Sequence, residues 1–184
     1  MSRDDPVEHA RARWRHRGER RPDFARPTGP GQESVWDYPR PPRLASDRRH
    51  VVVRAFGVTI AETDRAVRVL ETGSPPTFYI PPEDVRIEYL EPEPGVTTVC
   101  EWKGTAEHFS VRAGEGVVRK AAWRYGQPHD PYRALAGYYS FYPGRLACFV
   151  DGERVHPQSG PYYGGWVTAE IVGPFKGEAG TEDW

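Results

Sequence analysis

The stretch TTVCEWKGTAEHF, residues 97–109, decides the fold because two β-rich segments meet in it at a single glycine. TTVCEWKG and TAEHFSVR each have the composition of a strand, and Gly104 lies between them. The pattern therefore predicts two consecutive strands joined near Gly104. The same stretch holds Cys100, Trp102 and Lys103, so it also contains candidate functional residues.

Further strands and turns flank this stretch on both sides. HVVVRAF and VTIAET, residues 50–56 and 58–63, are separated by Gly57 and predict a hairpin. LACFVDGERVHP, residues 146–157, predicts a second hairpin with Asp151 and Gly152 as its two-residue turn. The 19 glycines, 19 prolines and 12% aromatic residues are typical of a turn-rich chain. We therefore expect a mainly β protein with little helix.

The composition divides the chain into three parts. Residues 1–33 are charged, rich in arginine and proline, and predict a flexible arm. Residues 34–156 predict a single all-β domain, which begins with the extended strip WDYPRPP anchored by Trp36 and Tyr38. Residues 157–184 form a glycine-rich tail that keeps several large aromatic residues, so we expect this tail to dock on the domain.

Charge and hydrophobicity exclude several classes of partner. The net charge of −1 offers no electrostatic attraction for nucleic acid, and no apolar run approaches the length of a membrane span. The N-terminus has no apolar core of a secretory signal, and two cysteines make no disulfide framework. We therefore expect a soluble, cytoplasmic protein with reduced thiols, either a monomer or a homodimer.

Five motifs occur in a characteristic order: FGVTIAET, FYIPPEDVR, TTVCEWKGTAEHF, AAWRY and AGYYSFYP. Together they resemble the domain of unknown function 427 family, with a family core at about residues 50–143. The flanking SVWDYPRPP and VDGERVHPQSGPYYGGW are similar to longer, actinobacterial-type bacterial members. The resemblance implies coiled antiparallel sheets of the β-tent type in a small barrel-like or sandwich body. The family carries a nucleotidyltransferase-like label, and its activity is not established.

Lys103 is the first candidate for a ligand-binding residue; the alternative is a lysine on a solvated face, paired with Glu101 or another acid. The chain has 22 arginines but only three lysines, so composition alone does not account for a lysine among aromatic residues. Side chains alternate between the two faces of a strand. A regular strand places Glu101 and Lys103 on one face, and Cys100 and Trp102 on the other. We therefore expect Cys100 to be a small buried core residue that a regular strand separates from Lys103, and only a break near Gly104 could bring the two together.

The aromatic residues predict a pocket as well as a core. Rings with a few polar tips bury ligand surface and fix its orientation. We expect a small-molecule binding protein with an aromatic pocket and Lys103 at one end. The candidate ligand-binding residues are Lys103, Tyr79, Trp102, Trp123, Tyr125, Tyr139, Glu101 and His108. Each ring has a core position as its alternative interpretation.

Two other functions remain open. The chain could be an enzyme in which Lys103 works with Glu101 or His108 as acid and base. It could instead be a protein-interaction module that uses the WDYPRPP strip and the tail. The six histidines are scattered and paired C-x-x-C motifs are absent, so we expect no metal and no cofactor. The sequence assigns no catalytic residue.

Overall fold

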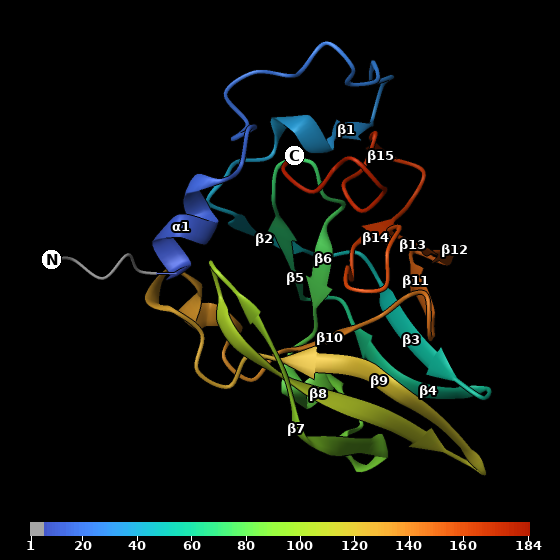
Figure 1. Ribbon diagram of the computed structural model, residues 1–184. Coiled ribbons are helices and arrows are strands. Elements are labelled where there is room, and N and C mark those ends of the chain that lie inside the picture. The colour runs from blue at the N-terminus through green and yellow to red at the C-terminus, as the bar shows by residue number, and fades with distance from the viewer. Residues whose placement is uncertain (1–5) are drawn as a thin grey trace, which may run out of the picture.

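A computed structural model describes residues 6–184 of the chain (Figure 1). The fold is mainly β, as predicted, and antiparallel strands form its three principal sheets. Among the described residues no sheet closes into a barrel, so the body has the sandwich-like form of the two expected arrangements. The first five residues of the expected arm lie outside the described range.

The longest sheet has the strand order β10–β9–β8–β7 and crosses the lower part of Figure 1. Its strands are β7 (Leu90–Cys100), β8 (Gly104–Ala113), β9 (Gly116–Arg124) and β10 (Tyr139–Phe141). The register of β7 against β8 shifts between Pro92 and Thr97, where residues 93–96 of β7 interrupt the regular pairing. The two strands predicted on either side of Gly104 are therefore confirmed, with an irregularity in the first.

A second sheet has the order β12–β11–β3–β4. Its strands are β3 (Val51–Ala55), β4 (Val58–Thr63), β11 (Ala147–Val150) and β12 (Glu153–Arg154). Both predicted hairpins are present. In the turn of each, Phe56–Gly57 and Asp151–Gly152, both residues have a positive φ. This backbone twist matches that of the flanking strands.

The third sheet has the order β2–β5–β6. It consists of β2 (Arg43–Asp47), β5 (Ala66–Leu70) and β6 (Thr77–Tyr79). Just after β6, Ile80 and Tyr139 exchange backbone hydrogen bonds of 2.8 and 2.9 Å, which attach this sheet to β10. Short 3₁₀ helices fill the connections: η2 (Pro82–Asp84), η3 (Ile87–Tyr89) and η4 (Asp130–Leu135).

The main hydrophobic core lies between the second sheet and the longest sheet. Side chains from both sheets are fully buried in it, including Val51, Val53, Ile60, Val111 and Phe141. Burying such a side chain contributes roughly 1.5–3 kcal/mol. A second, aromatic cluster lies beside this core and contains Tyr79, Trp102, Trp123, Tyr125 and Trp14. This second cluster positions the candidate site.

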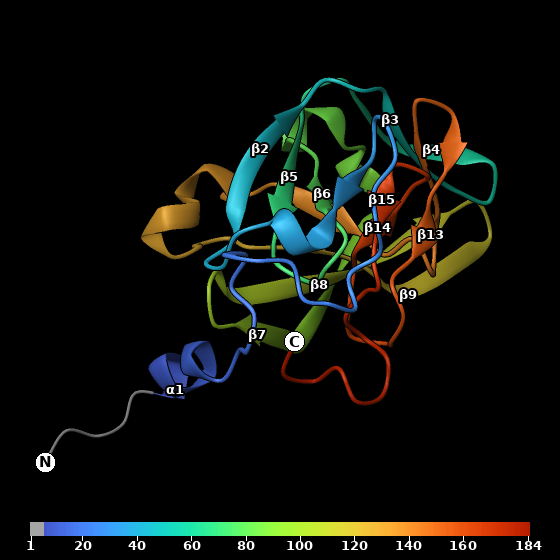
Figure 2. The same ribbon diagram turned by 90° about the horizontal axis from the view of Figure 1, so that it is seen from above.

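The N- and C-terminal segments lie next to each other. Their elements are α1 (Pro6–Ala12), β1 (Glu33–Ser34), η1 (Val35–Asp37), β13 (His156–Pro157), β14 (Trp166–Val167) and β15 (Ile171–Val172). β1 pairs in parallel with β15, and both views show these blue and red segments side by side (Figures 1 and 2). Trp166 is fully buried and stacks on Phe78, with ring centroids 4.8 Å apart.

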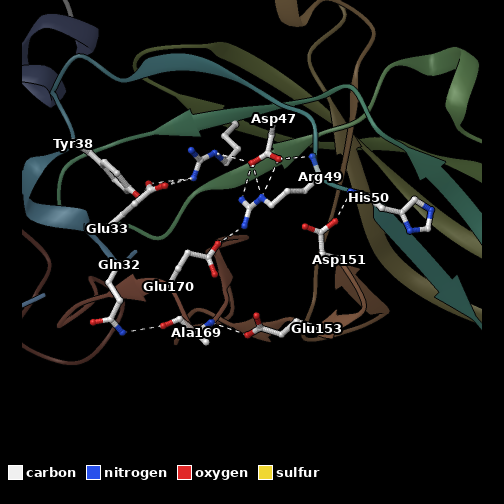
Figure 3. Close-up of polar contacts among 11 residues, drawn as sticks. Gln32, Glu33, Tyr38, Asp47, Arg49, His50, Asp151, Glu153, Ala169 and Glu170 are labelled. Atoms are coloured by element: carbon white, nitrogen blue, oxygen red, sulfur yellow. Dashed lines mark hydrogen bonds and ion pairs between the residues drawn. The ribbon is translucent and has the colours of Figure 1, made fainter. Parts of the chain in front are cut away.

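Ion pairs connect the terminal segments to the sheets, as Figure 3 shows. Arg49 binds Asp47 at the end of β2 and also binds Glu170 of the C-terminal segment. Gln32 donates to the Ala169 carbonyl at 3.1 Å. The Arg49 side chain is only 30% exposed, so dissolved salt weakens its ion pairs less than it would weaken fully exposed ones.

The WDYPRPP strip packs on the body through both of its aromatic anchors. Trp36 is fully buried and its indole nitrogen donates to the Pro174 carbonyl at 3.1 Å. Tyr38 is also buried and its hydroxyl donates to Glu33 at 2.7 Å. The rings of the strip are therefore part of the interior.

Candidate functional site

A cavity of about 350 Å³ opens between β5, β6, the end of β7, β9 and the C-terminal segment. This volume lies within the range of small-molecule sites. Its walls are largely aromatic: Trp14, Tyr79, Trp123, Tyr125, Tyr142, Tyr162 and Tyr163. Its charged lining residues are Arg13, Glu71, Glu101, Lys103 and Lys176. The cavity thus combines ring surface with a small number of charges.

A turn at the end of β7 brings Lys103 to this cavity together with Cys100. β7 ends at Cys100, residues 101–103 form a turn, and β8 begins at Gly104 with φ +99°. The Lys103 ammonium donates to the Cys100 sulfur at 3.2 Å. The separation expected of a regular strand does not hold, because strand alternation stops at Cys100 and the break before Gly104 brings the two side chains together.

His129, which lies outside the β7–β8 hairpin, holds the 101–103 turn in place. The backbone N–H of His129 donates to the Lys103 carbonyl at 3.1 Å, and its Nδ1 lies 3.0 Å from the Trp102 carbonyl. A Cβ added at Gly104 would lie 3.2 Å from the His129 ring. A glycine at position 104 thus leaves room for the His129 ring. The contacts of His129 with the turn fix the direction in which Lys103 points.

Lys103 is a buried cation, with 8% of its surface exposed. Burial alone would lower the pKa of Lys103, but electrostatic interactions with Cys100, Tyr125, Tyr79 and the Glu71 carboxylate raise that pKa well above its ordinary value. The ammonium therefore stays protonated at neutral pH. It lies 5.7 Å from the centroid of the Tyr125 ring, and it forms no ion pair with a carboxylate of residues 6–184.

A hydrogen-bonded pair of rings forms one wall of the cavity. The Trp123 indole nitrogen donates to the Tyr79 hydroxyl at 3.1 Å, and both side chains are buried. Trp123 also packs on Tyr142 with ring centroids 4.3 Å apart. Burial raises the pKa of Tyr79 and that of Tyr125, so both phenols stay neutral and can donate hydrogen bonds.

The chain matches the family described as a domain of unknown function (DUF427) over residues 43–155. This match extends from the first residue of β2 to the end of β12 and covers more than half of the 184 residues. The chain belongs to this family. The resemblance inferred from the five motifs is therefore confirmed. No curated protein matches the sequence.

The DUF427 region supplies only part of the cavity. From within it come Glu71, Tyr79, Cys100, Lys103, Trp123, Tyr125 and Tyr142. The opposite wall comes from residues outside the matched region: Arg13, Trp14, Gln158, Tyr162, Tyr163, Gly164 and Lys176. Gly164 allows the two walls to meet, because a Cβ there would lie 2.2 Å from the Trp123 ring.

Of the predicted ligand-binding residues, Lys103, Glu101, Tyr79, Trp123 and Tyr125 line this cavity. Glu101 is already engaged, since its carboxylate accepts from the Trp14 indole nitrogen at 2.8 Å. The structure thus brings together the lysine, one acid and three of the predicted rings.

The other three predicted residues lie elsewhere. Trp102 is buried beside the cavity without lining it, and Tyr139 packs on Phe109 in the main core. His108 does not line the cavity but lies behind its wall, because its Nε2 is 2.9 Å from the hydroxyl of the lining residue Thr98 and its ring stacks on the lining residue Tyr142. Burial, with help from the charges of Lys120 and Arg145, lowers the pKa of His108.

Lys176 is the main cavity residue that sequence reasoning missed. Only 4% of its surface is exposed, and its ammonium lies 3.2 Å from the centroid of the Trp14 ring. Burial is the largest influence and lowers the pKa of Lys176 to about 8. A signal was available: Lys176 is one of three lysines in the chain, so the compositional argument applied to Lys103 applies equally to it.

The described part of the chain lacks two other kinds of feature. Residues 6–184 hold no group of three or more His, Cys, Asp and Glu side chains arranged for a metal ion. Within the same range no helix has the length and apolar character required to cross a membrane.

Proposed function

We propose that this protein binds a small molecule with a planar, largely apolar body and an anionic group, and that Lys103 receives the anion. The observation that carries the proposal is a protonated, buried lysine at an aromatic cavity, with no carboxylate ion-paired to it among residues 6–184. The nearest polar partner of its ammonium is the Cys100 sulfur at 3.2 Å.

The energetic argument follows from the cost of burying charge. Taking an ammonium out of water costs several kcal/mol unless an opposite charge and hydrogen bonds compensate. The raised pKa of Lys103 shows that its surroundings favour the ammonium, but its hydrogen-bond partner is a thiol, which is a weak acceptor, so the positive charge is available to a ligand. An anionic ligand would compensate the charge, while the rings of Trp123 and Tyr125 would bury its apolar part.

Two observations count against the alternatives. For an acid–base enzyme, Lys103 would need Glu101 or His108 as its partner. Glu101 is held by Trp14, and His108 lies outside the cavity. For an interaction module, the aromatic rings of the WDYPRPP strip would need to be accessible, and Trp36 and Tyr38 are both buried.

A thermal-shift screen tests the proposal. Aromatic carboxylates, nucleoside monophosphates, neutral aromatics and polyols are added to the wild type, to Lys103→Met and to Lys120→Met. Lys120 is an exposed lysine of β9 outside the cavity, which makes it a matched control. A ligand at 100 times its Kd stabilises the folded state by about 2.7 kcal/mol, which is readily detected.

We expect an anionic ring compound to stabilise the wild type and Lys120→Met. The Kd of the same compound for Lys103→Met should be at least ten times higher. The proposal fails if no compound of these classes stabilises the wild type, or if Lys103→Met folds and binds as tightly as the wild type. Unliganded melting of each variant separates loss of binding from loss of fold.

A further inference from the structure

The cavity contains a second buried cation that no part of the DUF427 region supplies. Lys176 belongs to the C-terminal segment, beyond the matched residues 43–155. Its ammonium lies against the Trp14 ring at 3.2 Å and 5.6 Å from the centroid of the Tyr163 ring. Among the described residues it forms no ion pair and donates no side-chain hydrogen bond. Its direct contacts are therefore with rings, while Glu71 and Glu101 act on its charge only from beyond ion-pair distance.

The two acids of the cavity are engaged with other partners. Glu71 accepts from the guanidinium of Arg40 at 3.1 Å, and the Arg40 side chain is completely buried. Glu101 accepts from the Trp14 indole nitrogen at 2.8 Å. Neither carboxylate lies within ion-pair distance of Lys103 or Lys176. Arg40 neutralises Glu71, and Glu101 keeps its charge, so the three cations of the lining, Arg13, Lys103 and Lys176, leave the cavity with a net positive charge.

Two cationic groups thus converge on one aromatic cavity from different parts of the chain. Lys103 comes from the turn after β7, and Lys176 comes from the segment after β15. Exposed Arg13 adds a third positive charge to the lining. A ligand with a single negative charge would leave one buried ammonium without a counter-charge, which carries a free-energy cost. A ligand with two negative charges would neutralise both.

We propose that the ligand of this cavity is a small ring compound with two negative charges, and that Lys176 binds the second charge. This inference rests on the proposed function and adds the charge of the ligand to it. Two carboxylates on one ring or a single phosphate monoester would both meet the requirement. Because Lys176 and Trp14 lie outside the DUF427 match, the preference for a dianion comes from the extensions of this chain.

Isothermal titration calorimetry of a matched ligand series tests the inference. The series consists of benzamide, benzoate, benzene-1,3-dicarboxylate and phenyl phosphate, which share one ring and differ in charge. Each is titrated into the wild type, Lys176→Met, Lys176→Arg and Lys120→Met at one ionic strength. The two dianions distinguish a dicarboxylate site from a phosphate site.

We expect the wild type to bind at least one dianion ten or more times more tightly than benzoate. Lys176→Met should lose at least tenfold in dianion affinity while benzoate affinity changes by less than twofold. Lys176→Arg should retain part of the preference because it keeps the charge, and Lys120→Met should behave as the wild type.

Three results would overturn the inference, and they differ from failure of the proposed function. Equal affinities for benzoate and both dianions in the wild type would refute it without any variant. An unchanged preference of Lys176→Met for dianions would also refute the inference, and so would an equal loss of monoanion and dianion affinity in Lys176→Met. In both cases the proposal that Lys103 binds the anion would stand. If no member of the series binds, both proposals fall.

Discussion

Two of the three lysines of this chain are buried in one cavity, whereas the arginines form nearly all of its ion pairs. Arginine presents a planar fork that matches carboxylates, and Arg40 and Arg49 use it to connect segments. Lysine presents a compact point charge whose pKa responds strongly to burial. The difference in chemistry explains why the rare residue type is found at the candidate site.

Lys176 makes the stability of the protein depend on pH. Burial and the charges of Arg40 and Arg13 lower its pKa to about 8, whereas Glu71 and Glu101 oppose this shift. In the unfolded chain a lysine titrates near 10.4. Below pH 8 the lysine is protonated in both states, and the folded state bears the full cost of burying it. Between pH 8 and about 10 the unfolded state binds more protons, so stability rises with pH.

We therefore expect the free energy of unfolding of the wild type to increase relative to Lys176→Met by roughly 2 kcal/mol between pH 7 and pH 10. Urea denaturation of both proteins at the two pH values measures the difference. Lys120→Met, treated in the same way, should show no such change. A difference between wild type and Lys176→Met that is independent of pH would contradict the prediction.

At the scale of elements, hairpin turns determine where strands begin and end. Asp151 and Gly152 join β11 to β12 with φ values of 48° and 81°. The left-handed region costs a residue with a Cβ roughly 1–2 kcal/mol, and glycine adopts it freely. Apart from its two chain neighbours, no described residue has an atom within 4 Å of the position that a Cβ at Gly152 would occupy, so only backbone conformation opposes a substitution.

Gly152→Ala should destabilise the protein by about 1 kcal/mol through backbone strain alone. Gly152→Asn should cost less, because asparagine tolerates this conformation. Denaturant unfolding of the three proteins gives both differences. Equal stability of the alanine variant and the wild type would show that the turn rearranges without cost.

The 101–103 turn has a different role from these hairpins. It interrupts the regular alternation of β7 and places Cys100 and Lys103 together at the cavity. The other cysteine, Cys148, lies in the main core, where burial raises the pKa of its thiol. The two cysteines therefore differ in surroundings although both were predicted to be reduced.

At the scale of the whole molecule, Arg40 connects three segments. Its side chain is fully buried and donates to the carbonyls of His16, Thr72 and Trp184 at 2.7–2.8 Å, as well as to Glu71. The N-terminal segment, the loop after β5 and the C-terminal segment all meet at this one guanidinium. It also gives the Glu71 carboxylate a cationic partner.

Arg40→Met should destabilise the protein by about 3–5 kcal/mol, because it leaves buried carbonyls and Glu71 without their partner. Hydrogen exchange should increase first in residues 13–40 and 171–184. Arg43→Met replaces an exposed arginine nearby and should change stability by less than about 0.5 kcal/mol. Similar losses in both variants, or unchanged exchange in the terminal segments, would refute this role of Arg40.

The local features of the fold could be predicted from the sequence. Glycine-containing turns at Phe56–Gly57 and Asp151–Gly152, together with β-rich composition, determined the hairpins and the mainly β class. Turn chemistry acts between neighbouring residues, so it can be recognised without tertiary contacts. The rarity of lysine likewise directed attention to Lys103, and ring composition indicated Tyr79, Trp123 and Tyr125.

Only the tertiary structure decided which of these side chains meet. It turned Lys103 towards Cys100, left His108, Trp102 and Tyr139 outside the cavity, and brought Lys176 to it from the far end of the chain. Strand alternation predicts directions only while a strand stays regular, and β7 ends at Cys100. The approach of Lys176 depends on packing between segments distant in sequence, which local propensity does not encode.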